Sequence, residues 1–407
     1  MHIYLAILVM LFIPGIAVAG PDVTGVSGMV SHGNTVTISG SGFGTKSNPA
    51  QTVTAAPLAW DIVSEQYIGG VNKNAYTGLT DGSSLNTQGN GKVWQDIQGG
   101  DATVRYSTLR PQRNPHITAH YAVYNESSPY LKLWLGRLVY PGGGLYPPAT
   151  QKRFYLSFYR KLKNPTQSPG GGDGSCKILR ATSVNSPDVS GFAILSHMLY
   201  GTYYTSTSDG ITSWVDAGDE TGWVRWEIYL DANRKWFDVY KNGHYHQGSW
   251  SSVPGNLEMR PAAEWRFTIP GKPGYEFNVP SADLPAGDGL DATLFGYDDG
   301  HSLSGGQEID MGEIYFDNTP ARVEISNQST WDDSPENVSL HREVQGRLLN
   351  WSTNAITAAI NQGTFANGDN AFLYVIDSDG NVNHNGYPVI FGEVSSPPAA
   401  PTGLSVN

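Results

Sequence analysis

The sequence predicts an all-β protein assembled from β-sandwiches. No stretch of useful length repeats its apolar residues with a helical period, whereas many stretches alternate apolar and polar residues as half-buried strands do. Clusters of Gly, Pro, Asn and Asp bound these stretches, a spacing that is typical of sandwiches. The alternating stretches are Leu131–Tyr140, Arg153–Leu162, Gly191–Tyr200, Trp223–Leu230, Trp236–Tyr240, Trp265–Ile269 and Glu308–Phe316.

The chain begins with a predicted signal peptide, residues 1–19. An apolar run from Ile3 to Ile13 is broken by Pro14-Gly15 and is followed by Ala17-Val18-Ala19, an A-x-A cleavage pattern. The run is too short to cross a membrane. We therefore expect a secreted protein, extracellular or at the cell surface, without a membrane span.

Segments near the two chain ends carry strand patterns that belong together. Thr35–Gly44 reads TVTISGSGFG, and Asn350–Ile360 and Ala371–Asp377 alternate far downstream. The first segment resembles the opening strands of IPT/TIG domains, and the other two resemble the closing strands of the same immunoglobulin-like sandwich. The resemblance implies one domain built from residues 20–56 and 321–393, followed by a Pro-rich tail, residues 394–407. A surface loop tolerates such an insertion because domain termini usually lie close together.

The insert, residues 57–320, carries three further strand motifs. They are Pro57–Asp61, Gly222–Leu230 with the hairpin Asp238–Gly243 after it, and Gly312–Thr319. Together they resemble concanavalin A-like lectin/glucanase jelly rolls, the fold of legume-type lectins, laminarinases and several polysaccharide lyases. The resemblance implies a jelly-roll β-sandwich that acts on carbohydrate.

Composition narrows the classes of partner. The formal net charge of −12 argues against nucleic acid. Cys176 is the only cysteine, so no internal disulfide forms. With 11 Trp and 22 Tyr but only 15% charged residues, the chain has the balance of a sandwich that meets sugars.

Several predicted strands carry aromatic and cationic side chains on the face opposite their apolar residues. If Phe154, Leu156 and Phe158 face the core, period-two alternation exposes the residues between them. Aromatic rings stack on sugar rings, and cations pair with uronate or sulfate groups. We therefore predict non-catalytic binding of a polysaccharide, with a preference for acidic glycans, on the polar face of one sheet. The predicted ligand-binding residues are Trp134, Arg153, Tyr155, Tyr159, Arg225 and Tyr229.

Two enzymatic alternatives stay open. Glu308, Asp310 and Glu313 fit the E-x-D-x-x-E pattern of glycoside hydrolase family sixteen, and this resemblance implies a nucleophile, its electrostatic partner and a proton donor, brought to one face by a bulge. The competing interpretation is an acidic edge strand without catalytic role. Arg105–His116 holds the residue types that a polysaccharide lyase needs. A third class of function is a structural matrix or surface protein.

Calcium is the one cofactor that the sequence suggests. Asp298 and Asp299 form an acidic pair in a loop before the last strand of the insert, where jelly-roll lectins often hold calcium. Asp377–Asn381 resembles part of a calcium loop but lacks the downstream Glu of an EF-hand, which favours an ordinary turn.

Overall fold

A computed structural model describes the chain in segments, and its described part is all-β, which confirms the predicted fold class. Within that part the strands form five antiparallel sheets and no helix occurs, hence none that could span a membrane. The predicted signal peptide and residues 396–407 lie outside the described residues. Those residues are 20–47, 53–57, 59–61, 66–68, 71–72, 78–83, 97–98, 103–108, 113–116, 120–124, 130–134, 153–162, 177–183, 190–195, 199–203, 222–231, 236–242, 244–245, 248–249, 256–257, 290–298, 308–331 and 341–395.

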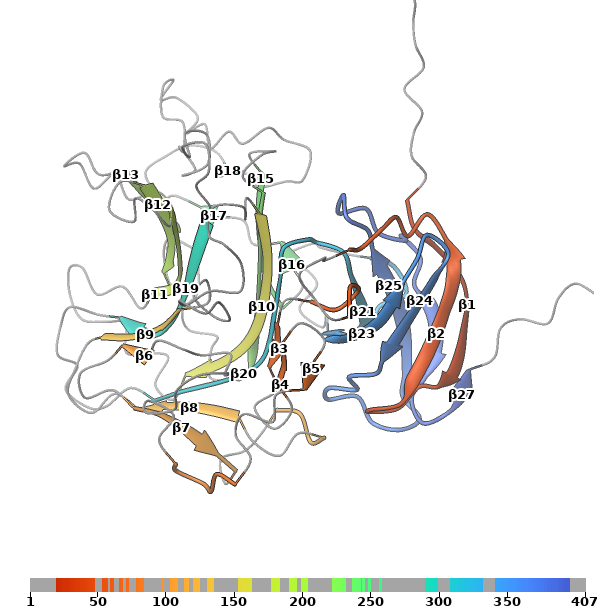
Figure 1. The fold of residues 1–407 in the computed structure, drawn as a ribbon, viewed down its shortest axis with the longest axis horizontal. Helices are drawn as coiled ribbons and strands as arrows, with labels where there is room; N and C mark the ends of the chain where they lie inside the picture. Colours follow the sequence, from red (N-terminus) through yellow and green to blue (C-terminus); the bar gives the residue numbers. More distant parts are fainter. Residues whose placement is uncertain are drawn as a thin grey trace, which may run out of the picture.

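Strands from both chain ends share one sandwich, which we call the terminal sandwich (Figure 1). Its five-stranded sheet has the order β23-β24-β2-β1-β27 and its four-stranded sheet the order β22-β21-β25-β26. The strands are β1 (Asp22–Met29), β2 (Thr35–Ser41), β21 (Arg322–Ser326), β22 (Arg342–Val344), β23 (Arg347–Trp351), β24 (Ala355–Ala359), β25 (Asn370–Ile376), β26 (Tyr387–Ile390) and β27 (Val394–Ser395).

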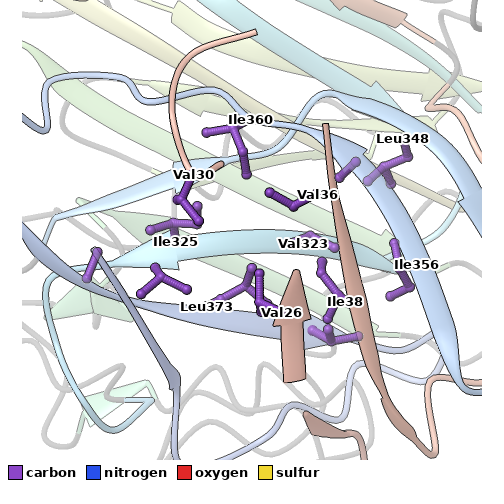
Figure 2. Packing of buried hydrophobic residues seen from close by; sticks show 14 of the residues in the cluster. Val26, Val30, Val36, Ile38, Val323, Ile325, Leu348, Ile356, Ile360 and Leu373 are labelled. Atoms are coloured by element: carbon purple, nitrogen blue, oxygen red, sulfur yellow. The ribbon is translucent and has the colours of Figure 1, made fainter. Parts of the chain in front are cut away.

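Alternation explains why the two chain ends pack together. In β2, Val36 and Ile38 are buried while Thr35 and Thr37 are exposed. The buried pair meets Val323 and other apolar side chains of the four-stranded sheet in one core cluster (Figure 2). Neither half alone covers this apolar face, so the sandwich needs both ends of the chain.

The insert lobe contains the remaining strands, in two large sheets and one small pair. The ten-stranded sheet comprises β3 (Ala59–Asp61), β4 (Gln66–Ile68), β5 (Val71–Asn72), β7 (Thr103–Ser107), β8 (His120–Tyr124), β10 (Arg153–Leu162), β14 (Val224–Asp231), β15 (Trp236–Lys241), β16 (His244–Tyr245) and β20 (Glu308–Asp317). The six-stranded sheet comprises β6 (Ile97–Gln98), β9 (Tyr130–Trp134), β11 (Lys177–Ser183), β12 (Ser190–Leu195), β13 (Leu199–Tyr203) and β19 (Leu290–Asp298), and β17 (Gly248–Ser249) pairs with β18 (Asn256–Leu257).

The ten-stranded sheet lies between its neighbours and is covered on both faces. Figure 1 shows the six-stranded sheet on one side and the terminal sandwich on the other. Phe154, Leu156 and Phe158 are fully buried on the first face, as alternation predicts. On the second face Tyr155 and Tyr159 are also buried, because the four-stranded sheet packs there. The prediction that this second face is exposed is therefore wrong.

Strand β20 is central, so its interpretation as an edge strand is wrong. It pairs with β10 on one side and with β3 and β8 on the other. Its register against β10 shifts between Gly312 and Tyr315, so that Glu313 and Ile314 together oppose one residue of β10. Glu313 takes the left-handed conformation there, with φ of 53°, which makes a β-bulge.

Lys46 and Trp60 make two of the contacts between the terminal sandwich and the ten-stranded sheet. The buried Lys46 Nζ donates to Asp317 Oδ2 at 2.5 Å, to the Ala321 carbonyl at 2.6 Å and to the Tyr315 hydroxyl at 3.0 Å. The Trp60 ring lies directly against Gly346, where a Cβ atom would come within 2.0 Å of the ring. Any larger residue at Gly346 would therefore push the lobes apart.

Candidate functional site

A pocket of about 420 Å³ opens between the insert lobe and the terminal sandwich. Residues of both lobes line it, and we call it the inter-lobe pocket. Among the described lining residues three are arginines, one is histidine, two are aromatic and none is acidic. They are Arg113, Tyr159, Trp223, Arg225, Asn242, His341, Arg342 and Thr364.

Arg225 is held in the pocket wall by a hairpin and an ion pair. Asn242, with φ of 53° in the turn after β15, accepts from the Arg225 backbone N–H at 2.9 Å and donates its own N–H to the Arg225 carbonyl at 2.8 Å. The guanidinium donates to both carboxylate oxygens of Glu324, at 3.0 and 3.2 Å. Arg225 is 2% exposed, and its Nε has no hydrogen-bond partner.

Arg113 also lines the pocket and forms ion pairs with two carboxylates. Its guanidinium lies 3.3 Å from the centroid of the Tyr159 ring. One Nη donates to Glu313 at 2.5 Å and the other donates to Glu343. Burial alone would lower the pKa of Arg113, but the charges of Glu313 and Glu343 outweigh burial and raise it. Arg113 therefore stays charged at any physiological pH.

His341 and Thr364 form the edge of the pocket contributed by the terminal sandwich. His341 Nε2 lies 2.6 Å from Glu343 Oε1 and 2.9 Å from Thr364 Oγ1. Its ring stacks on Phe365 with centroids 4.1 Å apart, which fixes the ring plane. Gly363 lies close to the Glu343 side chain, with which a Cβ atom would clash, and its φ of +57° suits glycine.

Burial and neighbouring charges shift the pKa values of the carboxyl groups that pair with the pocket residues. Burial alone would raise the pKa of Glu343, but Arg113 and His341 outweigh it and lower the pKa to about 2. Arg225 and Arg322 likewise hold the pKa of Glu324 below its usual range against the effect of burial. Burial raises the pKa of Glu313 despite Arg113. Arg113 and Arg225 line the pocket, and the carboxylates that pair with them are not among the described lining residues.

The structure separates the six predicted ligand-binding residues. Tyr159 and Arg225 line the inter-lobe pocket, although they are 6% and 2% exposed and not on an open face. Tyr155 and Tyr229 are buried against the terminal sandwich, and the expected exposure of all four is wrong. Arg153 is half-buried at the start of β10.

Trp134 lies on a different sheet from the other five residues. Its strand, β9, belongs to the six-stranded sheet, whereas β10 and β14 belong to the ten-stranded sheet. The prediction of one shared face is therefore wrong. A ligand-binding role for Trp134 stays a prediction, because its side chain is outside the described part.

The hydrolase-like residues lie on β20 but not in an open cleft. Asp310 is 4% exposed and Glu313 is 2% exposed, and Glu313 accepts from Asn114 Nδ2 at 3.1 Å as well as from Arg113. The bulge that the pattern implied is present at Glu313. The side chain of Glu308 lies outside the described part. A glycosidase needs its carboxyls at the substrate, and these two are covered.

Sequence reasoning missed most of the pocket. Arg113 belongs to the segment with lyase-type residues, and Trp223 begins the predicted strand Trp223–Leu230, so both carried a signal. His341, Arg342 and Thr364 carried none, because they come from a part of the chain more than 100 residues away from β14 and meet the other residues only through the lobe packing.

The two acidic clusters differ in how much of them the structure describes. Asp377 Oδ1 accepts the backbone N–H groups of Asp379 and Asn381, at 2.8 and 2.9 Å, so this loop is a self-satisfied turn. Asp298 ends β19, and Asp299 lies outside the described residues, so calcium at this pair stays a prediction. No group of three or more metal-ligating side chains occurs among the described residues.

Comparisons with known proteins give no family. No family model matches the chain, and no curated protein matches it. A Trypanosoma rangeli sialidase structure superposes with a TM-score of 0.28 at 9% identity over 53% of this chain and 27% of that one. The botulinum neurotoxin DC binding domain in complex with rat synaptotagmin II gives 0.28 at 13% identity over 53% and 43%. The serotype D/C VPI 5993 binding domain gives 0.29 at 8% identity over 70% and 71%. Similarity this low carries no argument about function.

Proposed function

We propose that this protein is a secreted, non-catalytic carbohydrate-binding protein that holds an acidic glycan in the inter-lobe pocket. The observation that carries the proposal is the lining: Arg113, Arg225 and Arg342 converge with His341, and no carboxylate lies among the described lining residues. Arginine pairs with carboxylate and sulfate groups through charge-assisted hydrogen bonds. A sugar acid supplies that group together with hydroxyls for Asn242 and Thr364.

Aromatic side chains complete the chemistry of a sugar site. Trp223 and Tyr159 line the same pocket as the arginines. Aromatic faces pack on the apolar C–H faces of sugar rings, while the arginines set direction through the acidic group. The negative net charge of the whole chain does not oppose this, because the local field at a pocket follows the nearest groups.

Burial of the carboxyls favours binding over hydrolysis. Asp310 and Glu313 are 4% and 2% exposed, and Glu313 is engaged by Arg113 and Asn114. A carboxyl locked in this way serves the fold rather than attack on a substrate. The hydrolase alternative would require the arginine to leave.

A lyase is the second candidate, and His341 favours it. Glu343 contacts His341 Nε2, which leaves Nδ1 as the acceptor if the Nε2 proton is donated to the carboxylate. An imidazole beside arginines has the parts needed to remove a proton next to a neutralised carboxylate.

One screen tests both candidates. The full-length protein is applied to immobilised acidic and neutral polysaccharides, and both retention and the release of unsaturated sugar ends are measured. We expect retention on acidic members without product, and weaker retention as salt rises. Trp223→Ala should reduce retention, whereas Tyr387→Ala, on β26 at the opposite edge of the four-stranded sheet, should not. Retention confined to neutral glycans would contradict the proposal, and unsaturated product would favour the lyase.

A further inference from the structure

The outer face of the ten-stranded sheet is closed beyond the inter-lobe pocket. Along β10, Tyr155 meets the terminal sandwich, where the Tyr155 hydroxyl faces Glu324 and the Arg322 guanidinium lies 4.0 Å from the Tyr155 ring centroid. No extended polymer can lie along the strands there.

The neighbouring strands of the sheet are closed as well. On β20, Tyr315 and Asp317 are sealed by Lys46, and on β3 the Trp60 ring abuts Gly346. Where the side chains of this face are described, on β3, β10 and β20, side chains of the protein itself therefore fill the path that a flat sugar chain would follow. The inter-lobe pocket lies at one side of these covered positions.

The size of the remaining space limits its occupant. Its volume is about 420 Å³, near the lower end of the roughly 300–1,000 Å³ that single small-ligand sites occupy. Both lobes line it, with residues on or next to β10 and β14 from the insert and with His341, Arg342 and Thr364 from the terminal sandwich. Such a space admits one or two sugar rings rather than a long segment of chain.

We infer that the inter-lobe pocket recognises the end of an acidic glycan, one or two rings long, and not the interior of a polysaccharide. The inference rests on the proposed function and adds the class of ligand. Arg113, Arg225 and Arg342 line the pocket and are the cations that pair with the carboxylate of the terminal sugar. Trp223 and Tyr159 flank the ring.

Chain length is the variable that tests the inference. Galacturonate, mannuronate and N-acetylneuraminate oligomers, from monomer to hexamer, are titrated calorimetrically against the full-length protein together with their parent polymers. We expect the affinity of at least one series to reach its plateau at the dimer. The carboxyl-reduced dimer of that series, which keeps the rings and loses the charge, should bind about 10–100-fold more weakly, as loss of a charge-assisted hydrogen bond predicts.

The same titrations separate two kinds of failure. If a polymer binds and affinity keeps rising up to the hexamer, the pocket binds the interior of the glycan chain. The end-recognition inference is then overturned and the proposed function stands. If no acidic oligomer or polymer binds, both are overturned. Partial hydrolysis gives a second measurement, because binding capacity per unit mass of polymer should rise in proportion to the number of chain ends. Unchanged capacity would also overturn the inference.

Discussion

Arg113 is the cation that compensates two buried carboxyl groups next to the pocket. It is the cation shared by Glu313 and Glu343, and both carboxyls are almost fully buried. Burying an ion is costly, so removing one member of such a group leaves its partners without compensation. The arginine therefore holds the β20 bulge, strand β22 and the pocket wall together.

Removing the Arg113 charge should destabilise the protein strongly. Arg113→Met is expected to lower the free energy of unfolding by about 3–5 kcal/mol, because two carboxylates would stay buried without their cation. Urea denaturation of the full-length protein measures this. Arg153→Met, at a half-buried arginine at the start of β10, is the control, and a loss of similar size there would show that the effect is not specific to the buried group.

Glu343 should make stability depend on pH in the acid range. Its folded pKa of about 2 lies below its ordinary value of 4.5, so its stabilising contribution is present above pH 4.5 and is lost as the pH falls toward 2. The raised pKa of Glu313 acts in the opposite direction, since protonation favours its buried state. Unfolding free energies of wild type and Glu343→Gln across this range should converge as the pH falls. Parallel curves would contradict the assignment.

Strand β20 is the element in which backbone strain and charge coincide. Glu313 occupies the left-handed region, which costs a non-glycine residue about 1–2 kcal/mol. The hydrogen bonds from Arg113, Asn114 and Asn361 hold it there. A conformation of this kind persists only because the surrounding contacts determine it.

Comparing Glu313→Gly with Glu313→Ala should isolate the backbone contribution. Both variants lose the same carboxyl contacts, but only glycine adopts φ of 53° without strain. We expect the glycine variant to be more stable than the alanine variant by about 1 kcal/mol in chemical denaturation. Equal stabilities would mean that the bulge relaxes once the side chain is gone.

The alternation of apolar and polar residues correctly predicted that one face of β10 is buried, but it could not predict that a second sheet covers the other face. Phe154, Leu156 and Phe158 are buried as expected. Tyr155 and Arg225 were expected in solvent, because period two reports which residues share a face and not whether another sheet packs there. The covering sheet comes from β21 and β22, whose sequences follow the insert. The pocket could not be predicted, since His341 and Thr364 reach Arg113 only through this long-range packing.

At the scale of the whole molecule, the lobes are joined by a buried ion pair away from the pocket. Lys46 and Asp317 are fully buried, and Lys46 comes from the segment that follows β2 while Asp317 ends β20. The pair therefore lies where the chain crosses between the lobes. A pocket shared by two lobes depends on such contacts for its shape.

Loosening that pair should weaken glycan binding without any change in the pocket lining. Lys46→Met leaves Asp317 buried without a cation, and we expect lower affinity for the acidic dimer together with a lower unfolding free energy. Adding Asp317→Asn should restore part of both, because the uncompensated charge is removed. Ligand titration and denaturation of the two variants measure this. Full affinity in Lys46→Met would show that the pocket keeps its shape independently of the pair.

The pairing of β1 with β27 also determines how the molecule carries mechanical load. Gly28 and Met29 pair directly with Ser395 and Val394, so tension applied between residues 20 and 395 falls on the terminal sandwich. The insert lobe is not under tension until β2 and β21, the strands that flank it in the sequence, unfold. A glycan held in the inter-lobe pocket is therefore shielded from a pull on the two chain ends, although a pull on the glycan itself loads the seam between the lobes.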